Sequence, residues 1–384
     1  MRVFVSPLSW TAALGTCVLL AVTGCGSDVT SPPPADPAVA AQQATAFLEA
    51  IKPKRDGRPV IAIVARNEGT ETTDFLLTHA VLQRADIAEV HAVAPRSGRV
   101  SLYPAFQIEV TRDLASFDQA YPAGADYVIV PAMSEPALDR ARDGAILSWL
   151  KKQSGHGARI VGVCAGALVV ADAGLLDHRR FTTHWYYLDQ LRKSHPTAIY
   201  VPHQRYVIDN NIATTTGITA SVPTMLSLVE AIGGRERARA LATEFGVSSW
   251  TPVHDSSRFG VNFSRGVSFI LNKMAFWRDE DMRVDVVDGM DDIALAFSAD
   301  AWSRTGHITV QAAAPAPVQL RSGITLIPDA AGSGDTQLLL TPNLKPIEQL
   351  DRTLCEIGSR YGISRREWVM MELEYPTPPS CDAS

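Results

Sequence analysis

The order of apolar and amphipathic segments predicts an α/β protein with a parallel sheet. Between residues 58 and 163, short apolar runs of strand length alternate with segments of helix length. Strands that are apolar throughout are buried on both faces, so this order favours a flavodoxin-like three-layer α/β/α sandwich. A similar order of strand and helix patterns returns after residue 284. The C-terminal part therefore reads as an α/β region that resembles a truncated second copy.

Each element of the first copy has its own signal. Continuous apolar runs predict strands at 58–65, 88–95, 125–133 and 158–163. Amphipathic segments at 78–84 and 143–153 predict helices. Reacting groups gather at the carboxyl ends of the strands in such sheets. Cys164, which follows the fourth strand directly, is expected at that edge.

Cys164 stands between an apolar run that ends at Val163 and a helix-like run that opens at Ala165. The N-terminus of a helix directs N–H groups at the sulfur, so a low pKa and a nucleophilic thiol are expected. Gly162 and Gly166 permit the tight elbow that such a turn requires. The alternative is a buried structural cysteine.

The second copy follows the order of the first over most of its length. Residues 284–302 have the strand-then-helix character of residues 61–82, and 307–315 parallel the strand at 88–95. Residues 323–342 and 346–362 then parallel the third strand and the helix before the elbow. No second elbow follows, so a structural or interfacial role is expected for the second copy. Asp291 and Asp292 are then not expected to assist a nucleophile. An unrelated extension with the same order of elements is the alternative.

Two motifs carry a family resemblance. The elbow and its continuation read VCAGALVVADAGLLDHRRFTTHW at 163–185, and TTTGITASVPTMLSLVEAIGG stands at 214–234. Both resemble the DJ-1/PfpI superfamily (ThiJ/PfpI, class I glutamine amidotransferase-like), over about residues 59–245. The likeness is greatest to the ligand domain of AraC-type regulators. Those regulators append a helix-turn-helix domain, but residues 246–384 show a strand-rich pattern without a basic recognition helix. No nucleic-acid partner is therefore expected.

The resemblance implies further site residues around Cys164. A superfamily acid follows the first strand, and the register of FLLTHAVL selects Asp74, with Glu71 one helical turn earlier as the substitute. The alternative for each carboxylate is that it only stabilises the helix N-terminus through the helix dipole. His184, in TTHW, matches a histidine near the sulfur, and a structural histidine beside an aromatic wall is its alternative.

Backbone amides of Ala165 and Ala132 are the candidate donors for an oxyanion. The family carries Gly-Gly where this chain has Ala132-Met133, and isonitrile hydratases carry Thr where residue 165 is Ala. The His-x-Glu of glutamine amidotransferases is absent after residue 221, which disfavours glutamine hydrolysis. The other histidines lack H-x-x-x-H or H-x-H spacing, so no metal site is expected. No other cofactor is expected either.

The N-terminus predicts export. Residues 1–25 resemble a bacterial lipoprotein signal peptide, whose lipobox, VTGC, makes Cys25 the acylated residue. The apolar run is shorter than the ~20 residues of a transmembrane anchor, which is the alternative. Residues 26–57 read as a linker with a short helix. The expected location is the periplasmic side of the cell envelope, at the outer membrane by resemblance to sorting rules.

Composition fits a folded body without a nucleic-acid surface. The chain has 384 residues, 46% of them hydrophobic, and a net charge of −6. These values allow two sizeable cores and indicate no basic face. Cys355 and Cys381 can pair in an oxidising compartment, although two cysteines alone do not decide it.

Residues 58–245 are thus expected to form a DJ-1/PfpI-like domain, and residues 246–384 the C-terminal α/β region. The expected function is that of a cysteine-dependent enzyme for a small carbonyl, nitrile-like or amide compound. The alternative is a non-catalytic ligand-binding or redox-sensing module on the same fold. The expected partners are a small molecule and, through the lipid, the membrane; a homodimer stays open.

Overall fold

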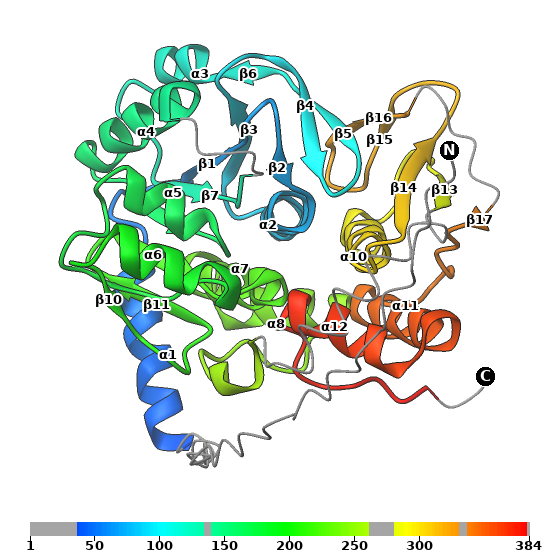
Figure 1. The fold of residues 1–384 in the computed structure, drawn as a ribbon. Coiled ribbons are helices and arrows are strands. Elements are labelled where there is room, and N and C mark those ends of the chain that lie inside the picture. The colour runs from blue at the N-terminus through cyan, green and yellow to red at the C-terminus, as the bar shows by residue number, and fades with distance from the viewer. Residues whose placement is uncertain (1–36, 134–139, 261–279, 330–335, 382–384) are drawn as a thin grey trace, which may run out of the picture. The chain divides into compact units, whose positions relative to one another are not determined.

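The computed structural model describes residues 37–133, 140–260, 280–329 and 336–381 (Figure 1). The predicted signal peptide, Cys25 and the first part of the linker lie outside these residues. The predicted short helix is α1 (Pro37–Ile51). No helix in the described part of the chain is both long and apolar enough to cross a membrane.

A central sheet of seven strands organises the first copy. Its strands are β1 (Val60–Val64), β3 (Glu89–Ala94), β6 (Arg112–Asp113), β7 (Tyr127–Val130), β8 (Arg159–Gly162), β11 (Tyr206–Asp209) and β12 (Ile212–Thr215). They lie in the order β11-β12-β8-β7-β1-β3-β6. All neighbours are parallel except β11, which pairs antiparallel with β12 at one edge. The four predicted strands are β1, β3, β7 and β8, and β7 and β8 are buried along their whole length.

Helices cover both faces of this sheet. They are α2 (Thr72–Ala85), α3 (Leu114–Ala120), α4 (Arg140–Gly155), α5 (Gly166–Asp172), α7 (Ser221–Gly233) and α8 (Arg235–Phe245). Alternate side chains of β1 divide between two separate cores: Ile61 and Ile63 pack with α2, α7 and α8, whereas Ala62 and Val64 pack with α3, α4 and α5. Because successive side chains of a strand point to opposite faces, this division defines three layers. The predicted α/β/α sandwich is confirmed.

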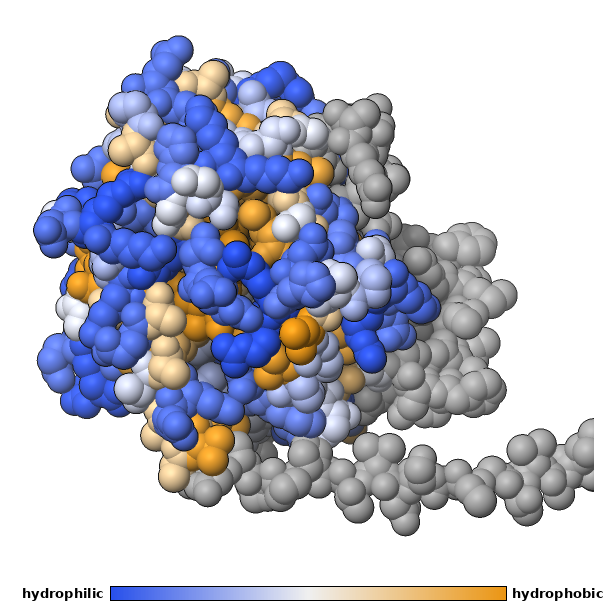
Figure 2. All heavy atoms as spheres, turned by 90° about the vertical axis from the view of Figure 1, so that its left-hand side faces the viewer, coloured by the Kyte–Doolittle hydropathy of each residue, from blue (hydrophilic) through white to orange (hydrophobic). Residues whose placement is uncertain are grey.

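Short elements join the edge strands to this body. They are β9 (Arg180–Phe181), β10 (Ile199–Tyr200), α6 (Leu188–Ser194) and the 3-10 turns η1 (Trp185–Tyr187), η2 (Ile218–Ala220) and η3 (Ser256–Arg258). Figure 2 shows the side of the molecule that carries α4, α5 and α6, where polar side chains cover most of the surface and apolar ones show between them.

The C-terminal region repeats the topology of the first copy. Its elements are β13 (Glu280–Asp285), α10 (Asp292–Ser303), β14 (Ile308–Ala313), β17 (Thr336–Gln337), α11 (Pro346–Tyr361) and α12 (Ile363–Leu373). The three strands are parallel in the order β14-β13-β17, which matches β3-β1-β7. The prediction of a truncated second copy is confirmed, since α11 leads into α12 and not into a further strand and elbow.

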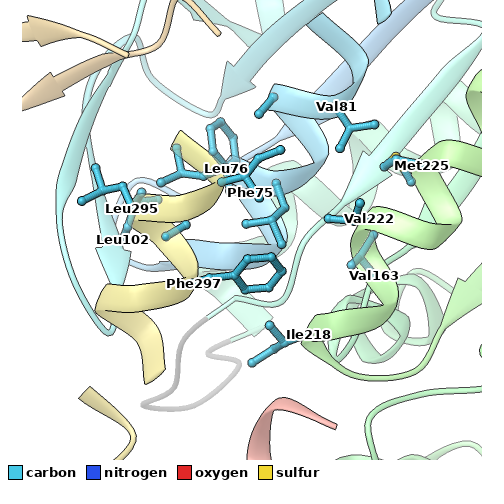
Figure 3. Close-up of a cluster of buried hydrophobic side chains, with 14 of the residues drawn as sticks. Phe75, Leu76, Val81, Leu102, Val163, Ile218, Val222, Met225, Leu295 and Phe297 are labelled. Carbon is cyan, nitrogen blue, oxygen red and sulfur yellow. The ribbon is translucent and has the colours of Figure 1, made fainter. Parts of the chain in front are cut away.

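The two copies share a sheet and a helix contact. The strands β2 (Thr70–Glu71), β4 (Gly98–Tyr103), β5 (Gln107–Val110), β15 (Val318–Gln319) and β16 (Thr325–Ile327) form one sheet in the order β15-β16-β5-β4-β2. Strand β5 of the first copy thus pairs directly with β16 of the second. Helix α2 lies between α7 and α10, and Phe75 and Leu76 share a core with Phe297 of α10 (Figure 3).

Two cysteines of the second copy are bonded to each other. Cys355 in α11 forms a disulfide with Cys381, which follows α12. The pairing left open by the sequence is therefore present. Cys164 is the free cysteine of the described residues.

Candidate functional site

Cys164 sits at a strained turn between β8 and α5. Its φ is 55°, in the left-handed region that non-glycine residues rarely adopt. A Cβ on Gly166 would lie 1.9 Å from the carbonyl oxygen of Val130, and one on Gly162 would lie 3.0 Å from the Cα of Ala167. The two glycines let the elbow lie directly against β7 and α5. Strain held by such packing is typical of functional positions.

Threonines hold the backbone of the elbow. The amide of Cys164 donates to the Thr215 hydroxyl at 3.1 Å, and its carbonyl oxygen accepts from the Thr183 hydroxyl at 3.0 Å. Both threonines belong to the two family motifs, but nothing in their spacing assigns them these contacts. They fix the thiol at the carboxyl edge of the sheet, where the sequence places it.

The thiol itself is protected from ionisation. The side chain of Cys164 is 4% exposed, and burial together with the charges of Asp74 and Glu71 raises its pKa well above the ordinary value. The hydrogen bond from the Ala165 amide acts in the other direction. Contrary to the expectation of a low pKa, one helix N-terminus does not outweigh burial beside carboxyl groups.

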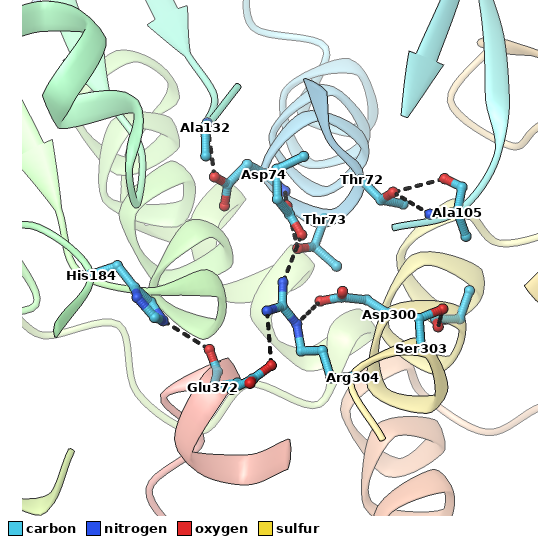
Figure 4. A network of polar contacts seen from close by, with 12 residues as sticks. Thr72, Thr73, Asp74, Ala105, Ala132, His184, Asp300, Ser303, Arg304 and Glu372 are labelled. Carbon is cyan, nitrogen blue, oxygen red and sulfur yellow. Dashed lines mark hydrogen bonds and ion pairs between the residues drawn. The ribbon is translucent and has the colours of Figure 1, made fainter. Parts of the chain in front are cut away.

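Asp74 faces the elbow from the first turn of α2. One carboxyl oxygen, Oδ2, accepts from the Ala132 amide at 3.0 Å, and Oδ1 lies 3.5 Å from the Ser221 hydroxyl (Figure 4). Complete burial raises the pKa of Asp74 to about 7, against the effects of the Ala132 amide and Arg304. The Ala132 amide is therefore already engaged by Asp74. Of the two candidate oxyanion donors, this leaves the Ala165 amide at the sulfur.

Glu71 is the N-cap of α2. Its Oε2 accepts from the Asp74 amide at 2.6 Å and from the Thr73 hydroxyl at 2.7 Å. Its Oε1 lies 3.1 Å from Nη2 of Arg304. Burial and the nearby Asp300 and Asp74 raise its pKa. Glu71 thus has the helix-terminal role of the alternative interpretation, and it also orients the turn that carries Asp74.

His184 uses both ring nitrogens in local contacts. Its Nε2 lies 2.9 Å from the Glu372 carbonyl oxygen, and its Nδ1 accepts from the Tyr186 amide at 3.2 Å. Burial lowers its pKa. An Nε2–H donor with an Nδ1 acceptor defines one neutral tautomer, which leaves no ring nitrogen for a proton of Cys164. This arrangement is that of the structural histidine.

Four charged site residues of the second copy were not predicted from the sequence: Arg304, Asp300, Glu372 and Glu374. The guanidinium of Arg304 lies 2.9 Å from Asp300, 3.3 Å from Glu372 and 3.1 Å from Glu71 (Figure 4). Burial disfavours its charge, but these carboxyl groups raise its pKa well above the ordinary value. The spacing of Asp300 and Arg304 by one helical turn was the available signal, and it predicts only a local pair.

A fourth carboxylate, Glu374, reaches the two family motifs from the end of α12. Its oxygens accept from the amides of Trp185 and Gly217, each at 2.9 Å, and Oε2 lies 3.3 Å from Nε2 of His254. Although burial alone raises its pKa, the contacts with His254 and the Gly217 amide hold it at about 2. Glu374 also contributes to the raised pKa of Cys164. The second copy therefore supplies part of the surroundings of the elbow.

Comparison with known proteins places the site in a family. Residues 60–231 match the model of the DJ-1/PfpI family. Over 143 residues the chain is 35% identical to the HTH-type transcriptional regulator CdhR of Pseudomonas aeruginosa, an alignment that covers 37% of this chain and 42% of the regulator. It is 33% identical over 116 residues to isonitrile hydratase of Pseudomonas putida, with 30% of this chain and 49% of the hydratase covered.

A ThiJ/PfpI family protein from Pseudomonas syringae of known crystal structure is 23% identical, with a TM-score of 0.48 over 57% of this chain and 88% of that one. The chain spans less than half the length of the two curated relatives. Its fold, its elbow and the matched residues identify 60–231 as a DJ-1/PfpI family domain.

Proposed function

We propose that this chain is a cysteine-dependent enzyme that acts on a small carbonyl, nitrile-like or amide compound. One observation carries the proposal: Asp74, with a pKa of about 7, is buried beside the strained thiol of Cys164. A general base works best when its pKa lies near the working pH. Because Cys164 keeps its proton at neutral pH, an adjacent base is what its attack requires.

The arrangement supports a sequence of proton transfers. As the sulfur of Cys164 bonds to the electrophilic carbon, its proton passes to the carboxylate of Asp74. The Ala165 amide stabilises the negative charge that develops on the substrate heteroatom. Asp74 then returns the proton to that heteroatom or, for an isonitrile, to the attacked carbon. The product of attack is a hemithioacetal from an aldehyde or a thioimidate from a nitrile-like carbon; an amide gives a thioester after its amine leaves.

The likeness to isonitrile hydratase supports a nitrile-like or isonitrile substrate within this class. Residue 165 is the point of difference, because Ala provides an amide but no hydroxyl. A substrate that needs a side-chain donor at this position would react slowly here. The screen should therefore include aldehydes and amides beside isonitriles.

A ligand-binding module on the same site is the second candidate. The Ala132 amide is occupied by Asp74 and both nitrogens of His184 are engaged, which limits the donors available for catalysis. The similarity to an HTH-type transcriptional regulator supports the same candidate. Such a module would bind its ligand without covalent attack by Cys164.

The test compares the full chain with Cys164→Ala and Asp74→Asn on the substrate panel. Loss of turnover in Cys164→Ala, with a fall of about 10²–10⁴-fold in kcat/KM for Asp74→Asn, supports the enzyme. Glu68→Gln is the control, because Glu68 lies in the loop between β1 and β2, is exposed and pairs with Arg96 at 2.6 Å. Turnover that survives in Cys164→Ala refutes the enzyme. Binding by calorimetry that is unchanged in Cys164→Ala, without turnover, selects the module.

We also propose that the chain is exported and anchored by a lipid on Cys25. The Cys355–Cys381 disulfide supports this, because such bonds persist in oxidising compartments. Mass spectrometry of the protein from membranes should find an acylated N-terminal Cys25. An unmodified N-terminus at another residue contradicts the anchor.

A further inference from the structure

The contacts between the two copies are reciprocal. Glu71 caps the N-terminus of α2, and Asp291 caps the N-terminus of α10. At the same spacing from its cap, each helix carries an arginine near its C-terminal end, Arg84 and Arg304. Nη1 of Arg84 lies 2.8 Å from Asp291, and Nη2 of Arg304 lies 3.1 Å from Glu71. Each arginine thus pairs with the cap of the other helix.

The hairpins of the two copies obey the same relation. Strand β5 is the second strand of the first hairpin and β16 is the second strand of the other, and they pair antiparallel with Ile108 opposite Leu326. At the start of α2 the Thr72 hydroxyl donates to the Ala105 carbonyl oxygen at 2.8 Å; at the start of α10 the carboxyl group of Asp292 accepts from the Ser322 amide at 2.9 Å. Both helices therefore contact their own hairpin at the same place.

Reciprocal contacts between equivalent residues are the mark of a two-fold interface, as in a symmetric dimer. Here both halves belong to one chain. The halves differ in chemistry, because the position of Asp74 is Ala294 in the second copy, which also ends without an elbow. Arg84 pairs with Asp291, Asp292 and Glu244. Arg304 pairs with Glu71, whose charge contributes to the raised pKa of Cys164.

We propose that the second copy is a built-in second subunit, which occupies the two-fold face of the first copy and supplies Arg304 to the Cys164 site as a positioning residue. Arg304 fixes Glu71, and Glu71 accepts from the Asp74 amide, so the guanidinium holds the turn that carries Asp74. The chain is a monomer with respect to this face. The proposal goes beyond the proposed enzyme, because it holds whether or not the site turns over a substrate.

The charges around Asp74 give the expected effect of removing the guanidinium. Asp74 is faced by Glu71 on its own helix, by Cys164 and Ser221, and by Asp300 and Arg304 on α10. Arg304 is the cation of this group, and it lowers the pKa of Asp74. Without it, Asp74 should keep its proton to higher pH, and alkylation of Cys164 assisted by this base should shift in the same direction.

The test uses the pseudo-symmetry as its control. Full-chain Arg304→Gln removes one inter-copy ion pair, with Glu71, and Arg84→Gln removes two, with Asp291 and Asp292. The pH profile of Cys164 alkylation by iodoacetamide, read by mass spectrometry, should move up by about one pH unit in Arg304→Gln and stay in place in Arg84→Gln. Arg304→Lys, which keeps the charge without the planar fork, should recover most of the profile and serves if Arg304→Gln does not fold.

Light scattering should give the same mass for the full chain and for its Arg84→Gln and Arg304→Gln variants. A profile that is unchanged in Arg304→Gln, or displaced equally in both glutamine variants, overturns the positioning role. A dimer that Arg84→Gln and Arg304→Gln both dissociate overturns the built-in subunit, because the two-fold face would then lie between chains. Since alkylation needs no turnover, an inactive protein would count against the enzyme and leave this test intact.

Discussion

The two copies have the same framework and different chemistry. In the first copy, α4 leads into β8 and the strained elbow of Cys164; in the second, α11 ends at Gly362 and leads into α12. Strand order, hairpin pairing and the capped helix are common to both. The comparison teaches that the framework does not require the site. In the second copy, which lacks the elbow, the hairpin and the capped helix form the interface with the first copy and contribute charged side chains to it.

The largest expected effect comes from Gly166 in the elbow, and Gly362 of the second copy is its control. Gly166→Ala would place a Cβ 1.9 Å from the Val130 carbonyl oxygen, so we expect a loss above about 4 kcal/mol or no folded protein. Gly362→Ala, at the α11–α12 junction, meets no atom within 4 Å and only the strain of φ 90°, about 1 kcal/mol. Urea unfolding measures both. Equal, mild effects would show that the elbow does not lie against β7.

A smaller effect is expected where the second copy reaches the first through Glu374. Its pKa of about 2 in the folded state lies below the ordinary 4.5, so its contribution to stability is present above pH 4.5 and is lost as the pH falls toward 2. Glu374→Gln should therefore lower the free energy of unfolding by about 3 kcal/mol at pH 7.

The same substitution should have little effect on stability near pH 2, because the wild-type carboxyl group is then also neutral. Glu372→Gln is a control from the same helix, since the pKa of Glu372 is raised rather than lowered. A stability difference between wild type and Glu374→Gln that is constant from pH 7 to pH 2 would contradict the assigned contacts.

The smallest expected effect separates the two reciprocal ion pairs. Double-mutant cycles with Arg304→Gln and Glu71→Gln, and with Arg84→Gln and Asp291→Asn, should each give a coupling energy within about 0.5–3 kcal/mol. The Glu71 side chain is 8% exposed and that of Asp291 is 24%, so the Arg304 cycle should give the larger value. A larger coupling energy for the Arg84–Asp291 pair than for the Arg304–Glu71 pair would contradict this expectation.

The sequence was sufficient for four strands of the central sheet and for the elbow, whereas the hairpin of β4 and β5 was not predicted. Apolar runs marked β1, β3, β7 and β8 because buried parallel strands must be apolar on both faces, and Gly162 and Gly166 marked a close approach of backbones. The repeat was readable because each element of the second copy returns in the same order. These are local patterns, which a sequence carries directly.

The surroundings of the thiol were not readable, since they depend on contacts across long stretches of chain. Arg304 gave a helical pair with Asp300, but its contact with Glu71 requires the packing of α10 on α2. Glu374 had no signal at all. The expectation of a low thiol pKa followed from the helix N-terminus. Burial reverses it, together with the charges of Asp74 and Glu71 and, from the second copy, Glu374.

The position of Glu374 in the chain has a consequence for biosynthesis. Gly217 and Glu374 are 157 residues apart, and His184 and Glu372 are 188 apart. The elbow and its loops are synthesised first. The amides of Trp185 and Gly217 therefore lack their hydrogen-bond acceptor, Glu374, until the end of the chain has been made. A chain that stops before Glu374 lacks the carboxylate that binds these two amides. The site is therefore complete only after α12 has been synthesised.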